Sequence, residues 1–379
     1  MHLDSVDLYG VRLYRMELFK LCCRKFFLLS MAAGLALLML YFFFVNLGDE
    51  RSTVNGKVYT GYEAVQTDRR ITEEFAGVLT DEKAERIIEK YGFPSVVEEN
   101  YGGFRDENYL NGFVTEYLGN GYMRDWNDYK ISTKLRPVAE SEPGQAAALS
   151  GGNIVLGYAK GWTVFLDMFQ MAMIFASILV LTGISPVFAQ ERQIRTADLL
   201  FTARNGKETD TRAKIAASFT LAAFIYAVFA AAAFVPVKFV YGFDGAACMT
   251  GTVVTGGAVN SAYPVTVKPV WYFTAAAMIL GFAALLVLCA AAFCISAHSE
   301  SSFHAFAVAG AVWMAPLLVR IMFGGAGYFL MMGTPLFLVM TGVVQELFPA
   351  PAIPLAVAAG TLVFCTGNAL KPAETSDSH

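Results

Sequence analysis

The sequence is poor in charge. Only 16% of its 379 residues are Asp, Glu, Lys or Arg, against about 25% in an average soluble domain. Hydrophobic residues make up 56% of the chain, and the mean hydropathy is +0.48. Together with apolar runs of about 20 residues or more, this composition predicts an all-α polytopic membrane protein. The net charge of −4 gives no sign of nucleic-acid binding.

Cysteine and histidine are also scarce. None of the six cysteines belongs to a Cys-x-x-Cys motif, and all but Cys248 lie in or beside apolar runs. We therefore predict packing residues rather than a disulfide framework. His298 and His304, two of the four histidines, are six positions apart and fall on different helical faces, so we expect no metal site.

A phosphate-binding loop is absent as well. Gly206-Lys207 resembles the end of that motif, but Phe201 stands where the leading glycine is required. Glu208 stands where the motif needs a hydroxyl side chain. The sequence therefore predicts no nucleotide or other cofactor bound by this chain itself.

What the sequence does contain is a series of long apolar stretches. The first, 26–47, would form roughly 33 Å of helix, which is long enough to cross a bilayer. It is longer than the apolar part of a usual signal peptide, and no small-x-small cleavage site follows it, so we predict an uncleaved span. We expect about six spans: 26–47, 162–188, 213–237, 270–296, 303–323 and 353–370.

The stretch 324–349 is apolar, but glycines and Pro335 interrupt it. Broken backbone is tolerated at membrane depth where protein surrounds it, so we predict a re-entrant outer segment of two short helices. If 324–349 crosses the membrane instead, the chain has seven spans and the tail 372–379 lies outside. Lys371 favours six spans and a cytoplasmic tail, because basic residues gather on the inner side.

The N-terminal residues 1–25 are basic, whereas the acidic Asp49 and Glu50 follow the first span. This asymmetry places the N terminus in the cytoplasm. Four apolar residues share one helical face in this region, which predicts an amphipathic connecting helix on the inner membrane surface: Val6, Tyr9, Leu13 and Met16.

The region 48–161 has a different composition, with 19 acidic and 13 basic residues. We predict a small α+β or irregular domain outside the cytoplasm. A helix is expected after Thr80, a suitable N-cap, and before Gly92. The aromatic residues of this region could bind a ligand, but a role in the domain core is the simpler prediction.

Basic residues concentrate in the cytoplasmic loop 189–212, between the second and third spans. Orientation in the membrane explains the sign of this charge but not the length of the loop, since the short turn 297–302 also joins two spans. Thr196 can cap a short helix whose apolar edge holds Leu199 and Leu200. Such a helix has the form expected of a docking element for a soluble partner.

The end of this loop also carries structural signals. Asn205-Gly206 is a strong turn signal. Asp210 or Thr211 is suited to cap the third span. We therefore expect the helix of the third span to begin after these residues.

The run "SPVFAQERQIRTADLLFTARNGKETDTRAKI" resembles the loop between the second and third spans of ABC-2 type, or type V, ABC transporter permeases. The N-terminal "YRMELFKLCCRKFF" is similar to the connecting helix of these subunits. A large outer domain between the first two spans is similar to one bacterial branch of the family. The residues of the loop that match are Phe188, Glu191, Leu199, Leu200, Thr202, Arg204, Gly206, Lys207 and Lys214.

The resemblance implies a permease subunit of an exporter in the bacterial plasma membrane, with both termini cytoplasmic. Two copies of an ABC ATPase would bind and hydrolyse ATP with Mg²⁺, and a second permease subunit would complete a homo- or heterodimer. The loop helix would be the coupling helix that seats in the ATPase. The coupling residues would be Glu191, Arg192, Thr196, Asp198, Leu199, Leu200, Thr202, Arg204, Gly206 and Lys207.

Asp167 and Gln170, in the second span, are candidates for the transport path, because ionisable residues inside spans are often functional. An interfacial position or a partner such as lysine would explain Asp167 equally well. The alternative function is a membrane sensor or scaffold with a ligand-binding outer domain, which would explain the domain but not the loop. An intramembrane enzyme would need paired acid-base or metal groups within the spans, and the sequence shows none.

Overall fold

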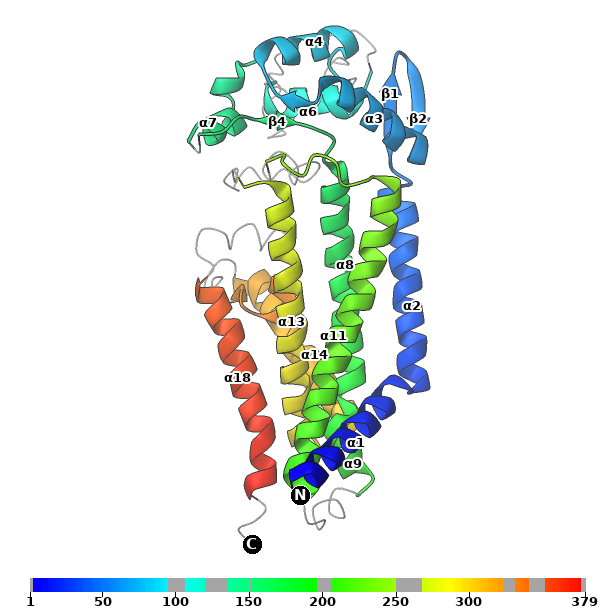
Figure 1. Cartoon of the computed structure of the whole chain (residues 1–379), viewed down its shortest axis with the longest axis vertical. Coiled ribbons are helices and arrows are strands. Elements are labelled where there is room, and N and C mark those ends of the chain that lie inside the picture. Colours follow the sequence, from blue (N-terminus) through cyan, green and yellow to red (C-terminus); the bar gives the residue numbers. More distant parts are fainter. Residues whose placement is uncertain are drawn as a thin grey trace. The chain divides into compact units, whose positions relative to one another are not determined.

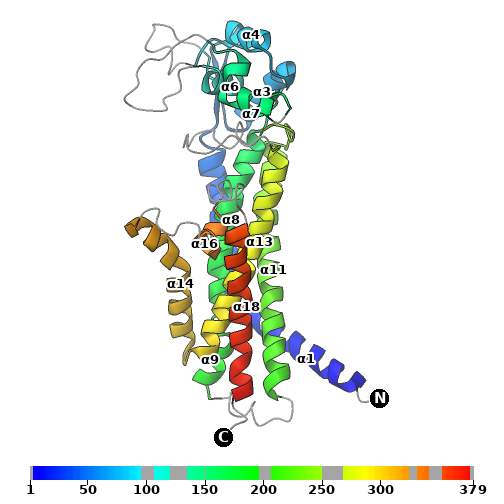
Figure 2. The same cartoon turned by 90° about the vertical axis from the view of Figure 1, so that its left-hand side faces the viewer.

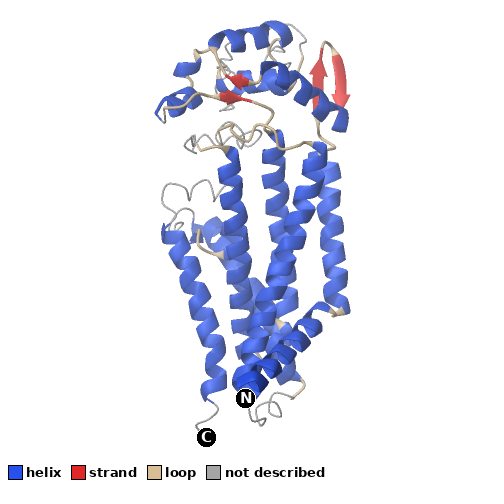
Figure 3. Cartoon of the chain, viewed as in Figure 1, coloured by secondary structure: helices blue, strands red, loops and turns tan. Residues whose placement is uncertain are grey.

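The computed structural model is mostly helical, with a few short strands (Figures 1 and 3). It describes residues 3–94, 106–119, 135–149, 151–195, 206–249, 268–323, 331–340 and 352–375. The chain forms two compact units. Unit 1 comprises 1–38, 169–232 and 277–379, and unit 2 comprises 39–168 and 233–276. The boundaries between the two units fall within helices.

Among the described residues, five helices are long and apolar enough to cross a membrane, which indicates a multi-pass membrane protein. A sixth apolar segment, Pro354–Leu370, is shorter. The elements that contain these segments are α2 (Lys25–Tyr41) with its π-helical extension η1 (Phe42–Asn46), α8 (Lys160–Ile184), α9 (Pro186–Gln193), α11 (Gly206–Val240), α13 (Val270–His298), α14 (Ser302–Phe323) and α18 (Ala352–Thr375).

Contacts between helix ends show that these helices alternate in direction. In unit 1, Ser296 near the end of α13 bonds to Ser185 after α8, and Gln193 at the end of α9 bonds to Ser302 at the start of α14. In unit 2, the end of α2 meets the start of α8, and Tyr241, directly after α11, donates to the Asn46 carbonyl. Successive long helices from α2 to α14 are therefore antiparallel.

The third apolar helix begins earlier than the sequence predicts. Helix α11 starts at Gly206, so the predicted capping role of Asp210 and Thr211 is wrong. Asp210 lies inside the helix because its carboxylate pairs with Lys214 one turn later instead of capping backbone N–H groups. Likewise, the predicted loop 189–212 is helical at both ends, in α9 and in the first turns of α11.

Of the predicted re-entrant segment 324–349, the structure describes 331–340, which contain the short helix α16 (Pro335–Leu338). This segment packs against α14, and its apolar side chains are buried. Gly333 approaches the start of α18 closely, since a Cβ atom there would lie 2.5 Å from the Pro354 carbonyl oxygen. Figure 2 shows α14, α16 and α18 in this unit.

The N-terminal segment forms the predicted helix, α1 (Leu3–Cys22). Tyr14 donates a hydrogen bond of 3.0 Å to Thr220 of α11, and Glu17 is buried and paired with Lys20. Met16 and Phe19 remain exposed, so α1 presents an apolar surface that the rest of unit 1 does not cover.

Unit 2 includes two antiparallel two-stranded sheets and several short helices. Strands β1 (Arg51–Val54) and β2 (Lys57–Thr60) form a hairpin, and β3 (Gly77–Val78) pairs with β4 (Val155–Leu156). The hairpin turns at Asn55-Gly56, where both φ angles are positive, as the favoured two-residue turn requires. The helices are α3 (Gly61–Phe75), α4 (Asp81–Tyr91), α6 (Tyr109–Tyr117) and α7 (Glu142–Leu149), with the 3₁₀ turn η2 (Val138–Glu140).

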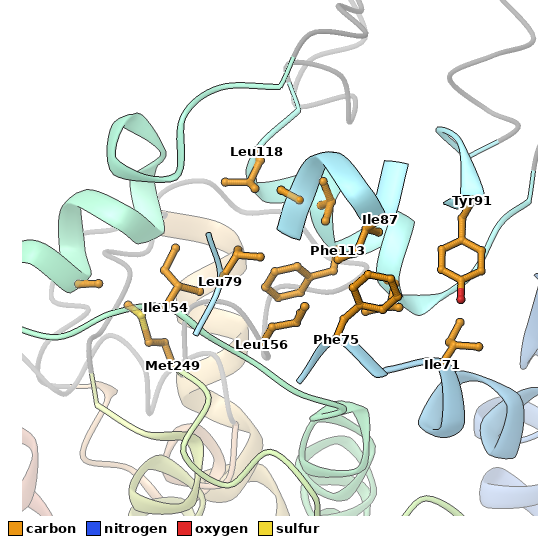
Figure 4. Packing of buried hydrophobic residues seen from close by; sticks show 14 residues of the cluster. Ile71, Phe75, Leu79, Ile87, Tyr91, Phe113, Leu118, Ile154, Leu156 and Met249 are labelled. Atoms are coloured by element: carbon orange, nitrogen blue, oxygen red, sulfur yellow. The ribbon is translucent and has the colours of Figure 1, made fainter. Parts of the chain in front are cut away.

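The helix predicted after Thr80 is confirmed as α4. The Thr80 hydroxyl accepts a hydrogen bond from the Lys83 N–H at 3.2 Å, and Gly92 ends the helix with a φ of 71°. Apolar residues of α3, α4 and α6 form a core with the short strands, as Figure 4 shows. Phe75, Tyr91 and Phe113 belong to this core, which confirms the simpler prediction for these aromatic residues.

Candidate functional site

The predicted coupling residues fall on both sides of a gap in the described chain. Glu191 and Arg192 lie on α9, and Gly206 and Lys207 begin α11. The predicted loop helix lies outside the described residues, and with it Thr196, Asp198, Leu199, Leu200, Thr202 and Arg204. The site can therefore be built from the two helices that bracket 196–205.

Helix α9 follows α8 after one residue, Ser185, whose backbone keeps right-handed helical angles. Pro186 occupies the first turn of α9, where its missing N–H costs no hydrogen bond, and Ser185 makes no side-chain cap. The cap comes from another helix. The Ser296 hydroxyl of α13 accepts hydrogen bonds from the N–H groups of Phe188 and Ala189, both at 3.0 Å, and donates one of 2.6 Å to the Ser185 carbonyl.

Sequence reasoning missed Ser296, because a capping residue is normally sought next to the helix that it caps. The only signal was the sequence Ser185-Pro186, which predicts a helix start whose N–H groups need an acceptor. Ser296 is fully buried and its hydroxyl has all three partners that it can take. It therefore fixes the joint between α8 and α9 to α13.

We expect Ser296→Ala to lower the stability of the protein by about 1–3 kcal/mol, because two backbone donors and one acceptor lose their partner in a buried place. The measurement is the thermal unfolding midpoint of the detergent-purified protein. Ser299→Ala is the matched control, since the buried Ser299 hydroxyl donates to the Ile295 carbonyl of α13, the helix that Ser299 directly follows, and caps no other helix in the described part of the chain. Equal effects of the two substitutions would contradict the capping role of Ser296.

A buried lysine joins the two helices that bracket the loop. Lys214 of α11 has only 2% of its side chain exposed, and its ammonium group pairs with Glu191 of α9 and Asp210 of α11. The Phe188 ring lies 5.6 Å from the same ammonium nitrogen. A lysine is rarely buried unless it is paired, so these two carboxylates are what allow Lys214 to occupy this position.

The remaining contacts of α9 connect it to the other helices of unit 1. Arg24, between α1 and α2, donates to the Gln190 side chain at 2.7 Å. The Gln193 side chain accepts the Ser302 N–H at 3.3 Å and so caps α14. Ser296 of α13 and Lys214 of α11 supply the other contacts of α9. Helix α9 is therefore bonded to α11, α13 and α14, and to the segment between α1 and α2.

The transport-path candidates lie further along α8. Asp167 is half-buried and accepts hydrogen bonds from the Tyr41 hydroxyl at 2.8 Å and the Asn46 amide at 3.1 Å. Tyr41 directly precedes the π-helical residues Phe42–Asn46, and Asn46 is the last of them. Such π-helical insertions often occur at functional sites. The partners of Asp167 are thus neutral hydrogen-bond donors rather than a lysine. Gln170 is half-buried on the same helix.

Comparison of the chain with known protein families, curated proteins and solved structures found no match. The likeness of the loop to exporter permeases therefore stays a prediction from the sequence.

Proposed function

We propose that this chain is the membrane-spanning permease subunit of an ATP-binding cassette exporter. It would couple ATP hydrolysis by a separate cytoplasmic ATPase to substrate export by alternating access. The proposal is supported by the multi-pass helical fold, the alternating helix directions and the exporter-like loop sequence. The alternating-access step requires that ATP binding to the partner favours one arrangement of the helices over another.

The proposed topology has six crossings, by α2, α8, α11, α13, α14 and α18. The outer domain, about 48–161, would lie outside the cytoplasm, and both termini would lie inside. The exposed Met16 and Phe19 of α1 would lie against the inner surface of the bilayer.

The observation that carries the proposal is the buried Lys214 pair with Glu191 and Asp210. It ties the end of one apolar helix to the start of the next, on both sides of the exporter-like loop. A force applied to this loop by a partner would act on α8 and α11 together, because the ionic contacts oppose separation of their ends. Ser296 and Gln193 would extend the movement to α13 and α14.

Co-purification tests this proposal. After extraction in a mild detergent, we expect an ABC ATPase in about equal amount to this chain, together with a second permease subunit of the same or a related kind. Absence of an ATPase under conditions that preserve membrane complexes would contradict the permease proposal.

The second candidate function is a sensor or scaffold, and the folded domain of unit 2 is the observation in its favour. Its core is well formed around Ile87, Leu110 and Val114, none of which is exposed. A sensor would be purified without a stoichiometric ATPase and would keep its signalling partner, so the same preparation separates the two functions.

A further inference from the structure

Unit 2 contains a buried carboxylate that the proposed transport cycle does not use. Asp68 lies on α3 with 2% of its surface exposed. Its Oδ1 atom accepts hydrogen bonds from the Ser52 hydroxyl at 2.6 Å and from the Tyr109 N–H at 3.3 Å. Both donors are neutral, so they solvate an ionised carboxylate without balancing its charge.

A second buried carboxylate lies nearby and takes most of the available positive charge. Glu50 accepts hydrogen bonds from the Lys160 ammonium group at 2.5 Å and from the Tyr241 hydroxyl at 3.0 Å. Lys160 also attracts Asp68, so one lysine serves two buried carboxylates. Arg69, the neighbour of Asp68 on α3, pairs with Asp244 at 2.7 Å. The cluster therefore carries one negative charge in excess when both carboxylates are ionised.

An independent observation concerns Tyr158, which precedes α8. Its hydroxyl oxygen is buried and has no hydrogen-bond partner among the residues that the structure describes, although only 4% of the residue is exposed. Its ring packs against the Tyr109 ring, with centroids 5.0 Å apart, and Glu50 and Asp68 both act electrostatically on its hydroxyl. A buried hydroxyl without a partner is uncommon, and this one gives neither Asp68 nor Glu50 a further hydrogen bond.

We propose that this cluster binds one proton from solvent, on the Asp68 carboxyl group. The neutral acid no longer needs a cation, so Lys160 then serves Glu50 alone. Lys160 is the first residue of α8, and Tyr241 directly follows α11. Proton uptake at Asp68 thus changes the electrostatic contacts at the ends of two apolar helices.

The pKa of Asp68 is shifted in the direction that this geometry predicts. Burial, with a smaller contribution from the charge of Glu50, raises the pKa of Asp68 to about 6 despite the lowering effects of Ser52, Lys160 and the Tyr109 N–H. The ordinary value in an unfolded chain is about 3.9. The folded state therefore holds the proton more tightly, and its stabilising effect is present below about pH 4 and is lost as the pH rises towards 6.

Infrared spectroscopy of the full chain in lipid tests the proposal, with the pH stepped from about 8 to about 4.5. We expect the C=O stretching band of a protonated carboxylic acid to grow with a midpoint near pH 6. Asp68→Asn should remove this component, whereas Asp244→Asn, which changes an exposed carboxylate of the same unit, should leave it intact. A folded Asp68→Asn protein that keeps the band would overturn the proposal.

Three further variants remain informative even if Asp68→Asn fails to fold. Lys160→Met should raise the midpoint, because it removes the cation that favours ionised Asp68. Glu50→Gln should lower it, because it removes a repelling negative charge. Tyr158→Phe is the matched control and should leave the midpoint nearly unchanged, because the Tyr158 hydroxyl has no hydrogen-bond partner among the described residues. A shift of the midpoint in the opposite direction for Lys160→Met or Glu50→Gln would contradict the assignment of the proton to Asp68.

Discussion

Replacing Lys214 by methionine should destabilise the protein by about 3–5 kcal/mol, the usual cost of removing one partner from a buried ion pair. The substitution leaves the carboxylates of Glu191 and Asp210 close together and without their shared cation. Mutual repulsion should then separate α9 from the start of α11. The measurement is the thermal unfolding midpoint of the purified protein, followed by its ability to stimulate the partner ATPase.

A matched control lies two residues earlier on the same helix. Arg212 pairs with Glu208, but both side chains are more than 70% exposed, and surface pairs of this kind contribute about 0–1 kcal/mol. Arg212→Met should therefore change the stability little. If Lys214→Met had no larger effect than Arg212→Met, the buried pair would not hold these helices together.

A triple variant separates folding from coupling. Combining Lys214→Met with Glu191→Gln and Asp210→Asn removes all three charges, so most of the lost stability should return. We expect ATPase stimulation to stay low, because the ionic contact between α9 and α11 is still absent. Full stimulation by the stable triple variant would show that the ionic contact plays no part in coupling.

Replacing both Leu199 and Leu200 by aspartate should abolish ATPase binding and ATPase stimulation. The proposal places the apolar edge of the loop helix in a groove of the partner, and two carboxylates cannot enter an apolar groove without a large desolvation penalty. The measurements are the amount of ATPase recovered with the purified chain and the substrate-dependent rate of ATP hydrolysis.

The first control is that the double aspartate variant still inserts and folds normally. Insertion, expression and unfolding midpoint should be unchanged, because the substituted residues would contact the partner rather than the spans. Thr209→Ala, in the first turns of α11, gives a second control with no added charge. Normal ATPase recovery with the double aspartate variant would refute the docking role of Leu199 and Leu200.

Much of the helical framework could be predicted from the sequence, because long apolar runs have few alternatives to a membrane-spanning helix. Local signals were equally reliable where a single residue decides the backbone, as at Thr80 and Gly92 of α4. The prediction failed at the start of α11. An aspartate side chain can cap the start of a helix or pair with a lysine inside it. Asp210 pairs with Lys214, which lies one turn later on α11.

The candidate site was less predictable than the helices around it. Glu191 and Lys214 could be identified as candidates because they match the exporter-like loop sequence. Their contact with each other could not be predicted, because it joins residues 23 positions apart. Ser296 had no signal of its own, since it caps a helix that begins 110 positions earlier in the chain. Such pairings depend on which helix ends come into contact, and neither composition nor periodicity predicts those contacts.

The sequence by itself determined that this is a multi-pass helical protein with a polar domain between the first two apolar helices and a basic loop after the second. These properties follow from hydropathy and segment length, which can be read directly from the order of the residues. Only the tertiary structure decided which carboxylates share a lysine, as Glu191 and Asp210 do at Lys214, and which stays buried among neutral donors, as Asp68 does. Burial and charge pairing are set by residues distant in sequence, so they exist only once the helices have packed.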